Sequence, residues 1–178
     1  MALSVTHPVS VTLVAILATG LSMSRAVADS VAHLPRIVIN DAFRLAPDAL
    51  ALCANDAAWW GENAEAKAFN GRRFSMASVT GVDRVPAEAG IGRESNSALL
   101  GLHVAVKAYG AKQIFLYGVD LQGEHYFGQH QRLNNPTPHR FDVFKQQFAV
   151  YANTLPADVE VFNASPNSAL KCFPFRAL

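Results

Sequence analysis

The sequence predicts an α/β fold: a three-layer, Rossmann-like domain with a mainly parallel sheet flanked by helices. Three apolar runs each stop abruptly at small polar residues, namely Val11–Leu17, Ile114–Tyr117 and Val159–Phe162. Continuous apolar runs of this length are typical of parallel strands that are buried on both faces. Helix-like stretches separate the runs, and strands that alternate with helices indicate βαβ units.

Size and composition favour one domain spanning residues 1–178. Hydrophobic residues make up 51% of the chain, charged residues 16%, and the formal net charge is +1. Because this charge provides no basic field, we expect no nucleic-acid partner. Cys53 and Cys172 have no CxxC partner, which fits a reducing compartment, and we expect a cytoplasmic protein. No apolar run reaches the roughly 20 residues that a membrane span needs.

The N-terminus has an alternative interpretation. Val9–Met23 is largely apolar, and Ala26-Val27-Ala28 follows it in the small-x-small pattern of a signal-peptide cleavage site. However, no Lys or Arg precedes the apolar run. We therefore expect a strand here, and the alternative of a secretory signal over residues 1–28 stays open.

The first half of the chain predicts short elements. Met23–His33 has an apolar stripe and begins after Ser22 or Ser24, either of which could cap a helix, while Pro35 ends it. The Trp59-Trp60 pair is expected as a buried aromatic anchor. The glycine-rich stretch Gly81–Glu94 predicts an irregular surface connection. Strands are expected at three further stretches: Arg36–Ile39, Leu50–Ala54 and Arg73–Ala77.

The second half contains the clearest helix. Ser97–Tyr109 places apolar residues near one face and ends at Gly110, a favoured C-cap residue. After the Ile114–Tyr117 strand, residues 120–138 form a long polar loop, a length typical of lids and binding loops. A helix from about Phe141 to Asn153 and the strand Val159–Phe162 complete the pattern.

Polar residues where strands end are the candidate ligand contacts, because open α/β sheets bind ligands outside the carboxyl ends of their strands. Thr19-Gly20-Leu21-Ser22 lies between a strand and a helix, where backbone N–H groups can hold phosphate or simply form a tight turn. Asn40 and Asp120 follow strands, and each could bind a ligand or cap a turn. Asn96 and Ser97 precede the clearest helix, where an N-cap is the simpler role for Ser97.

Three histidines lie in or beside the long polar loop: His125, His130 and His139. Imidazole is suited to proton transfer near neutral pH, so each is a candidate general base. Their spacing does not match the HExxH helix pattern, and we expect no metal site.

Four segments, in order, resemble the bacterial sialyltransferase fold and the related hydroxymethylpterin diphosphokinase-like family: LATGLSMS, IVINDAF, ESNSALLGLHVAVKAYGAKQIFLYGVDL and VEVFNASPNSALKCF. Small phage or prophage proteins are similar to this group too. The sequence departs from the sialyltransferase pattern at Leu21, where a proline is expected, and at Ala98, where a glycine is expected. The chain is also shorter than most sialyltransferases.

The resemblance implies a nucleotide site and a catalytic base. It implies that His139 deprotonates an acceptor hydroxyl, without metal or other cofactor. It implies that Gly20, Ser22, Asn40 and Ser97 line the nucleotide site. Together with the polar residues at strand ends and helix starts, the full set of expected nucleotide contacts is Thr19, Gly20, Ser22, Asn40, Asn96, Ser97, Asp120, Ser165, Asn167 and Ser168.

Three functions follow as hypotheses. The first is a glycosyltransferase that binds a nucleotide-activated sugar, with a CMP-linked sugar as the candidate donor, and transfers the sugar without metal. The second is diphosphate transfer from ATP to a pterin-like alcohol, which needs Mg²⁺ and carboxylates such as Asp41, Asp56 or Asp120. The third is a non-catalytic nucleotide-binding or phage structural-accessory protein.

Overall fold

The computed structural model describes residues 11–128 and 135–178 and contains a seven-stranded sheet. Each pair of neighbouring strands is parallel, in the order β5-β4-β3-β2-β1-β6-β7. The strands are β1 (Leu13–Leu17), β2 (Arg36–Ile39), β3 (Ala51–Cys53), β4 (Arg72–Ser75), β5 (Asp83–Arg84), β6 (Gln113–Tyr117) and β7 (Glu160–Asn163).

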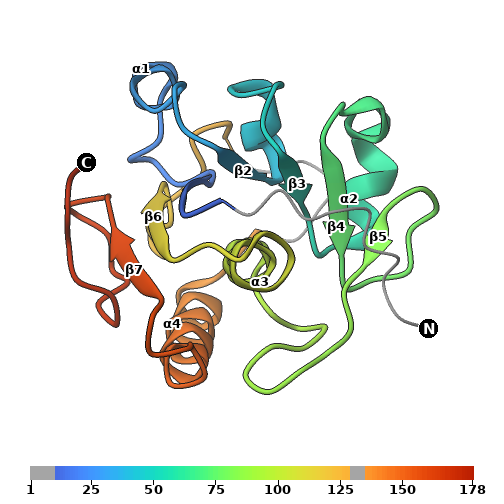
Figure 1. Cartoon of the computed structure of the whole chain (residues 1–178). Helices are drawn as coiled ribbons and strands as arrows, with labels where there is room; N and C mark the ends of the chain where they lie inside the picture. Colours follow the sequence, from blue (N-terminus) through green and yellow to red (C-terminus); the bar gives the residue numbers. More distant parts are fainter. Residues whose placement is uncertain (1–10, 129–134) are drawn as a thin grey trace.

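Helices cover both faces of the sheet, which confirms the predicted three-layer α/β class. Figure 1 shows α1 and α2 on one face and α3 and α4 on the other. The helices are α1 (Arg25–Ser30), α2 (Ala57–Glu62), α3 (Ser97–Tyr109) and α4 (Pro138–Ala152), with 3-10 turns η1 (Asn40–Arg44) and η2 (Ala64–Ala68). None of the helices in the described ranges is long and apolar enough to cross a membrane.

The core explains why the strand sequences are continuously apolar. Successive side chains of a strand point to opposite faces. Along β1, Val14 and Ile16 pack in the α3 and α4 layer, whereas Ala15 and Leu17 pack in the layer of α1 and α2. Both faces of the central strand are therefore buried. The Trp59-Trp60 pair is buried as expected.

The bounds predicted for α3 are confirmed, but its N-cap is Asn96 and not Ser97, which is the first residue of the helix. The Asn96 side chain accepts a hydrogen bond from the Ala98 N–H at 2.7 Å, and Gly110 adopts a left-handed conformation with φ 65°. These caps were visible in the sequence because they depend only on neighbouring residues.

Other boundaries differ from the predictions. The helix expected over Met23–His33 covers only Arg25–Ser30, because the Ser24 side chain caps it and Met23 packs in the core. α4 begins at Pro138 rather than near Phe141, after a cap by the Thr137 hydroxyl.

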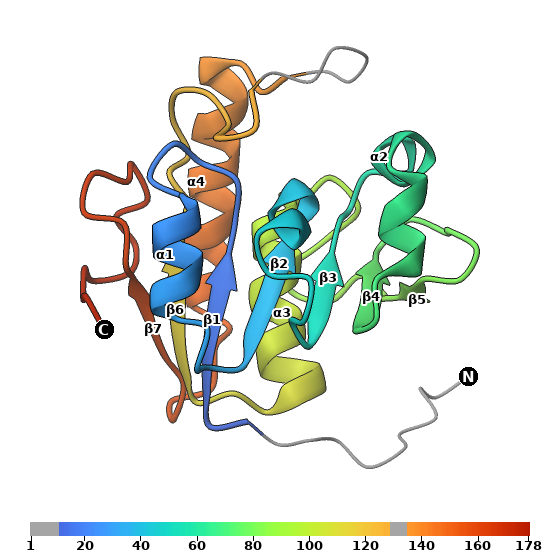
Figure 2. The same cartoon turned by 90° about the horizontal axis from the view of Figure 1, so that it is seen from above.

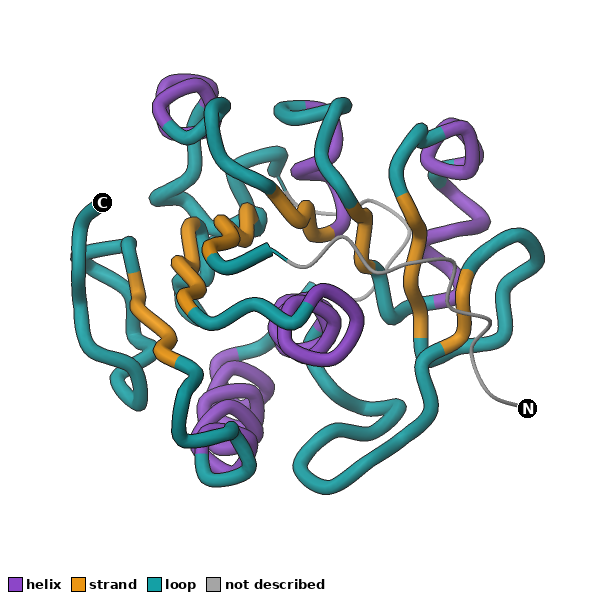
Figure 3. The backbone as a smooth tube through the Cα atoms, in the orientation of Figure 1, coloured by secondary structure: helices purple, strands orange, loops and turns teal. Residues whose placement is uncertain are grey.

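Two elements were not anticipated. Helix α2 begins after Asp56, whose side chain accepts from the Ala58 N–H. The two-residue strand β5 falls within the stretch expected to be irregular, and its pairing with β4 is parallel. Figure 3 shows the long loop that leads from β5 to α3.

The sheet has a topological switch point between β1 and β6. The chain builds β1 to β5 outward in one direction and then returns to place β6 on the other side of β1. Figure 2 shows the central strands running toward one common edge. Because α3 and α4 connect parallel strands, both helices begin at this carboxyl edge.

Candidate functional site

A pocket of about 710 Å³ opens at the carboxyl edge of the sheet. It is lined by the residues that follow β1, β2, β3 and β6 and by the starts of α3 and α4. Ligand sites of α/β sheets form in this position. Six of the predicted site residues line it: Thr19, Gly20, Asn40, Asn96, Ser97 and Asp120.

Two glycines let the turns after β1 and β6 approach closely. The Gly20 N–H donates to the Gly118 carbonyl at 2.8 Å. A Cβ on Gly20 would lie 2.5 Å from Asp120 Oδ2 and 2.6 Å from the Gly118 oxygen. Gly118 has φ 69°, a conformation that glycine adopts without strain. The two turns form one tightly packed wall of the pocket.

The Asp120 side chain, which follows β6, forms hydrogen bonds to the turn that follows β1. Its side chain accepts the Ser22 backbone N–H at 2.7 Å and the Ser22 hydroxyl at 2.5 Å. Since the single Ser22 hydroxyl proton goes to Asp120, the Ser165 hydroxyl, 2.8 Å away, must donate to Ser22 Oγ. Ser165 Oγ in turn accepts from the Gly118 N–H at 3.0 Å. These hydrogen bonds connect the turns that follow β1, β6 and β7.

These hydrogen bonds change the role expected for the turn that follows β1. The Ser22 N–H, a candidate phosphate donor, already meets a carboxylate, and α1 begins only at Arg25. The Gly20 and Met23 N–H groups donate to backbone carbonyls. A phosphate at this turn would compete with Asp120.

The turn from Ser165 to Ser168, predicted as part of the site, does not line the pocket. Neither Ser165, Asn167 nor Ser168 is among the lining residues. The Ser168 hydroxyl is buried and donates to the Val119 carbonyl at 2.7 Å, while the Asn167 carbonyl accepts from the Gln122 side chain at 2.6 Å. This turn supports the loop after β6.

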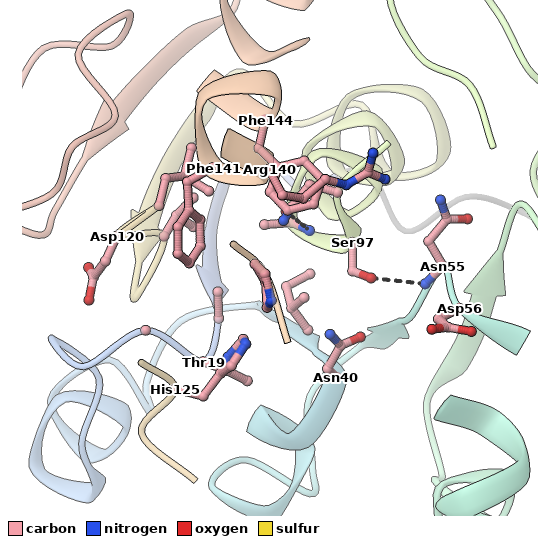
Figure 4. Close-up of a pocket in the computed structure, with 18 of the residues that line it drawn as sticks. Thr19, Asn40, Asn55, Asp56, Ser97, Asp120, His125, Arg140, Phe141 and Phe144 are labelled. Atoms are coloured by element: carbon pink, nitrogen blue, oxygen red, sulfur yellow. Dashed lines mark hydrogen bonds between the residues drawn. The ribbon is translucent and has the colours of Figure 1, made fainter. Parts of the chain in front are cut away.

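The histidines occupy different positions. His125 lines the pocket, and its Nδ1 lies 2.7 Å from the Thr19 hydroxyl oxygen. Figure 4 shows the side chains of both residues. His139 is exposed in the first turn of α4 and does not line the pocket. His130 lies outside the described residues.

Asn55 fixes the start of α3. Its backbone N–H donates to the Ser97 hydroxyl oxygen at 3.0 Å, the bond drawn in Figure 4. Its side-chain amide donates to the Arg93 and Ser95 carbonyls and accepts from the Met76 N–H. Asn55 therefore holds the loop before α3 against β3 and β4. The Ser97 hydroxyl, which accepts this bond, keeps its own proton for donation.

Two arginines among the lining residues were not predicted. Arg93 precedes α3, and Arg140 lies in the first turn of α4. Arg140 donates to the Glu94 carbonyl at 3.2 Å and lies over the Phe144 ring at 4.9 Å. The sequence does place both arginines just before or within the first turn of a predicted helix. However, only the strand order of the folded sheet shows that the two helix starts meet at one pocket.

Asn40 is strained where it lines the pocket. Its φ is 47°, a left-handed conformation that Asn tolerates better than most residues. Its side-chain oxygen is buried and has no hydrogen-bond partner among residues 11–128 and 135–178. Backbone strain and an unpaired polar atom are features that cluster at functional sites.

The carboxylates named for a magnesium site are separately engaged. Asp41 pairs with Arg44 and accepts from the Trp59 indole, and it does not line the pocket. Asp56 caps α2, and Asp120 binds Ser22. Over residues 11–128 and 135–178, no group of three or more His, Cys, Asp or Glu side chains is arranged to hold a metal ion.

Comparisons with known proteins add evidence on the fold. No protein-family model and no curated protein sequence matches the chain. The solved structure of MAf glycosyltransferase from Magnetospirillum magneticum AMB-1 is similar, with a TM-score of 0.62 and 13% sequence identity. The match covers 97% of this chain and 34% of that one, so the chain spans about a third of that protein. At this identity the likeness shows a shared α/β fold.

Proposed function

We propose that the chain binds a nucleotide-activated sugar, CMP-linked, in this pocket and transfers the sugar without a metal ion. The observation that carries the proposal is the convergence of two long helix starts and two guanidinium groups on one polar pocket at the switch point. The shared fold with a glycosyltransferase supports it.

The phosphate of the donor is placed at the starts of α3 and α4. These helices have 13 and 15 residues, and helix N-termini carry partial positive charge. The Asn96 and Thr137 side chains cap the Ala98 and Arg140 N–H groups, and Pro138 at the start of α4 has no N–H, so the charge of the helix ends is the contribution invoked here. Arg93 adds positive charge, Arg140 adds a guanidinium that also pairs with the Glu94 carboxylate at 3.5 Å, and the Ser97 hydroxyl adds a donor. This arrangement replaces the β1 turn as the proposed anion site, because Asp120 occupies that turn.

The same groups supply the chemistry of transfer. Sugar transfer breaks the bond between the anomeric carbon and a phosphate oxygen, and negative charge develops on the leaving phosphate. Fixed N–H groups and guanidinium groups aimed at that charge stabilise the transition state. The magnesium-dependent alternative has less support, since its three carboxylates are bound by separate partners.

A thermal-shift screen tests the binding step. CMP, CDP, UDP, GDP and ATP are each added with and without Mg²⁺, because a ligand that binds the folded state raises the melting temperature. We expect CMP to stabilise the chain equally with and without Mg²⁺. Stabilisation by ATP only with Mg²⁺ would favour diphosphate transfer, and no shift with any nucleotide would contradict the proposal.

Charge variants locate the phosphate. Arg93→Gln and Arg140→Gln should each weaken CMP binding roughly tenfold or more, as expected for the loss of a charged hydrogen bond. Arg84→Gln is the matched control, because Arg84 is exposed on β5 and does not line the pocket. Equal CMP affinity in all three variants would contradict a phosphate site at the starts of α3 and α4. Binding is measured by isothermal titration calorimetry.

A further inference from the structure

We infer that His125, oriented by Thr19, is the general base that deprotonates the acceptor hydroxyl; this inference rests on the proposed function. The geometry points to it because the ring lines the pocket and contacts a buried hydroxyl at the end of β1.

Backbone hydrogen bonds hold the segment around His125 against the turn that follows β1. The Tyr126 N–H donates to the Thr19 carbonyl at 2.7 Å, and His125 forms an antiparallel bridge with Gly20. Thr19 is 6% exposed and follows the central strand directly. Backbone bonds on one side and the Thr19 hydroxyl on the other therefore fix both the position and the orientation of the imidazole.

Thr19 positions the imidazole ring. His125 Nδ1 lies 2.7 Å from Thr19 Oγ1, and which of the two atoms donates depends on the tautomer of the ring. In the proposed step the neutral imidazole takes the acceptor proton. Thr19 contacts no substrate in this scheme and is a positioning residue.

The step balances without an added reagent. The acceptor oxygen forms a bond to the anomeric carbon of the donor sugar. The bond from that carbon to the nucleotide phosphate oxygen breaks, and its electron pair remains on the phosphate. The acceptor proton moves to the His125 imidazole, and the phosphate charge is held by the groups at the starts of α3 and α4.

The other described histidines lie elsewhere. His139 and His33 are exposed and do not line the pocket. His103 is 3% exposed and contacts the Tyr151 hydroxyl between α3 and α4. Within the described ranges, His125 is thus the histidine in the pocket lining.

Hydrolysis of a CMP-linked sugar, with water as acceptor, tests the assignment alongside CMP affinity. His125→Gln should lower kcat about 10²- to 10⁴-fold, as for loss of a general base, while CMP affinity stays within about twofold. His33→Gln is the matched control and should hydrolyse the donor at the wild-type rate.

The Thr19 variants test its positioning role. Thr19→Val should lower kcat about tenfold and change the pH dependence of kcat, because the imidazole loses its hydrogen bond to the Thr19 hydroxyl. Thr19→Ser keeps the hydroxyl and should restore the wild-type profile. Identical profiles for Val and Ser would contradict the role of Thr19.

The outcomes separate this inference from the proposed function. Equal kcat for wild type and His125→Gln would overturn the His125 assignment and leave the proposed function standing. Loss of kcat in His139→Gln with retention in His125→Gln would move the base to α4. CMP binding without hydrolysis by the wild type would overturn both transfer and the base, and absence of CMP binding would overturn the proposed function at its first step.

Discussion

At the residue scale, the pocket wall depends on a close approach that only glycine allows. Gly20 lies against Asp120 and the Gly118 carbonyl, at distances where a Cβ has no room. The bonds from Ser22 to Asp120 need this approach. The wall is therefore sensitive to a single methyl group.

We predict that Gly20→Ala lowers the free energy of unfolding by about 1–3 kcal/mol, the usual cost of overpacking. Gly61→Ala is the matched control: Gly61 lies in α2, no atom would contact its Cβ within 4 Å, and Ala favours a helix by up to about 1 kcal/mol. Urea unfolding of both variants checks the prediction. Equal effects of the two substitutions would contradict the packing argument.

Individual site residues were predictable where strand ends determine them. Thr19, Asn40 and Asp120 come together at the pocket because the carboxyl ends of parallel strands share an edge. Hydrogen-bond partners were not predictable, because they join distant residues. Ser165 and Ser168 follow a strand in the same way, yet their hydroxyls bind neighbouring turns.

At the element scale, α3 and α4 share a buried polar contact. His103 Nδ1 of α3 lies 3.0 Å from the Tyr151 hydroxyl of α4, and the rings meet edge to face. Burial lowers the pKa of His103, partly offset by Glu88 and reinforced by Lys107. The folded chain therefore disfavours the charged imidazole.

This contact predicts a pH dependence of stability. Because the unfolded chain binds a proton more readily at His103, the full contribution is present above the ordinary His pKa of about 6.5 and falls as the pH drops below it. Urea unfolding at pH 7.5 and 5.5 should show a smaller loss of stability in His103→Gln than in wild type. His33→Gln, which changes an exposed histidine, should behave as wild type; equal losses in wild type and His103→Gln would contradict the prediction.

Elements were predictable where local signals were complete. Helix α3 has an N-cap, an apolar face and a C-cap glycine within one stretch, and its bounds were confirmed. Strand β5 has two residues and helix α2 has six, which is too short for a periodic pattern. The helix predicted at α1 was too long at its start, because Met23 continues the apolar stripe in the sequence although it lies before the helix and packs in the core.

At the scale of the whole molecule, the switch point gathers the proposed donor and base groups at one pocket. β1 pairs with β6 although nearly a hundred residues separate them in the chain. That pairing places Thr19 beside the segment of His125 and brings the starts of α3 and α4 to the same edge. The strand order was not predictable, because apolar patterns give strands but not their neighbours.

The most direct test of the account is to map CMP binding by amide chemical shifts of the ¹⁵N-labelled chain. We predict shifts at the carboxyl edge, at Thr19, Ser97 and Arg140, and none at Lys112 and Asp158, which pair at the opposite edge. Shifts confined to that opposite edge, or none at millimolar CMP, would contradict a nucleotide site in this pocket.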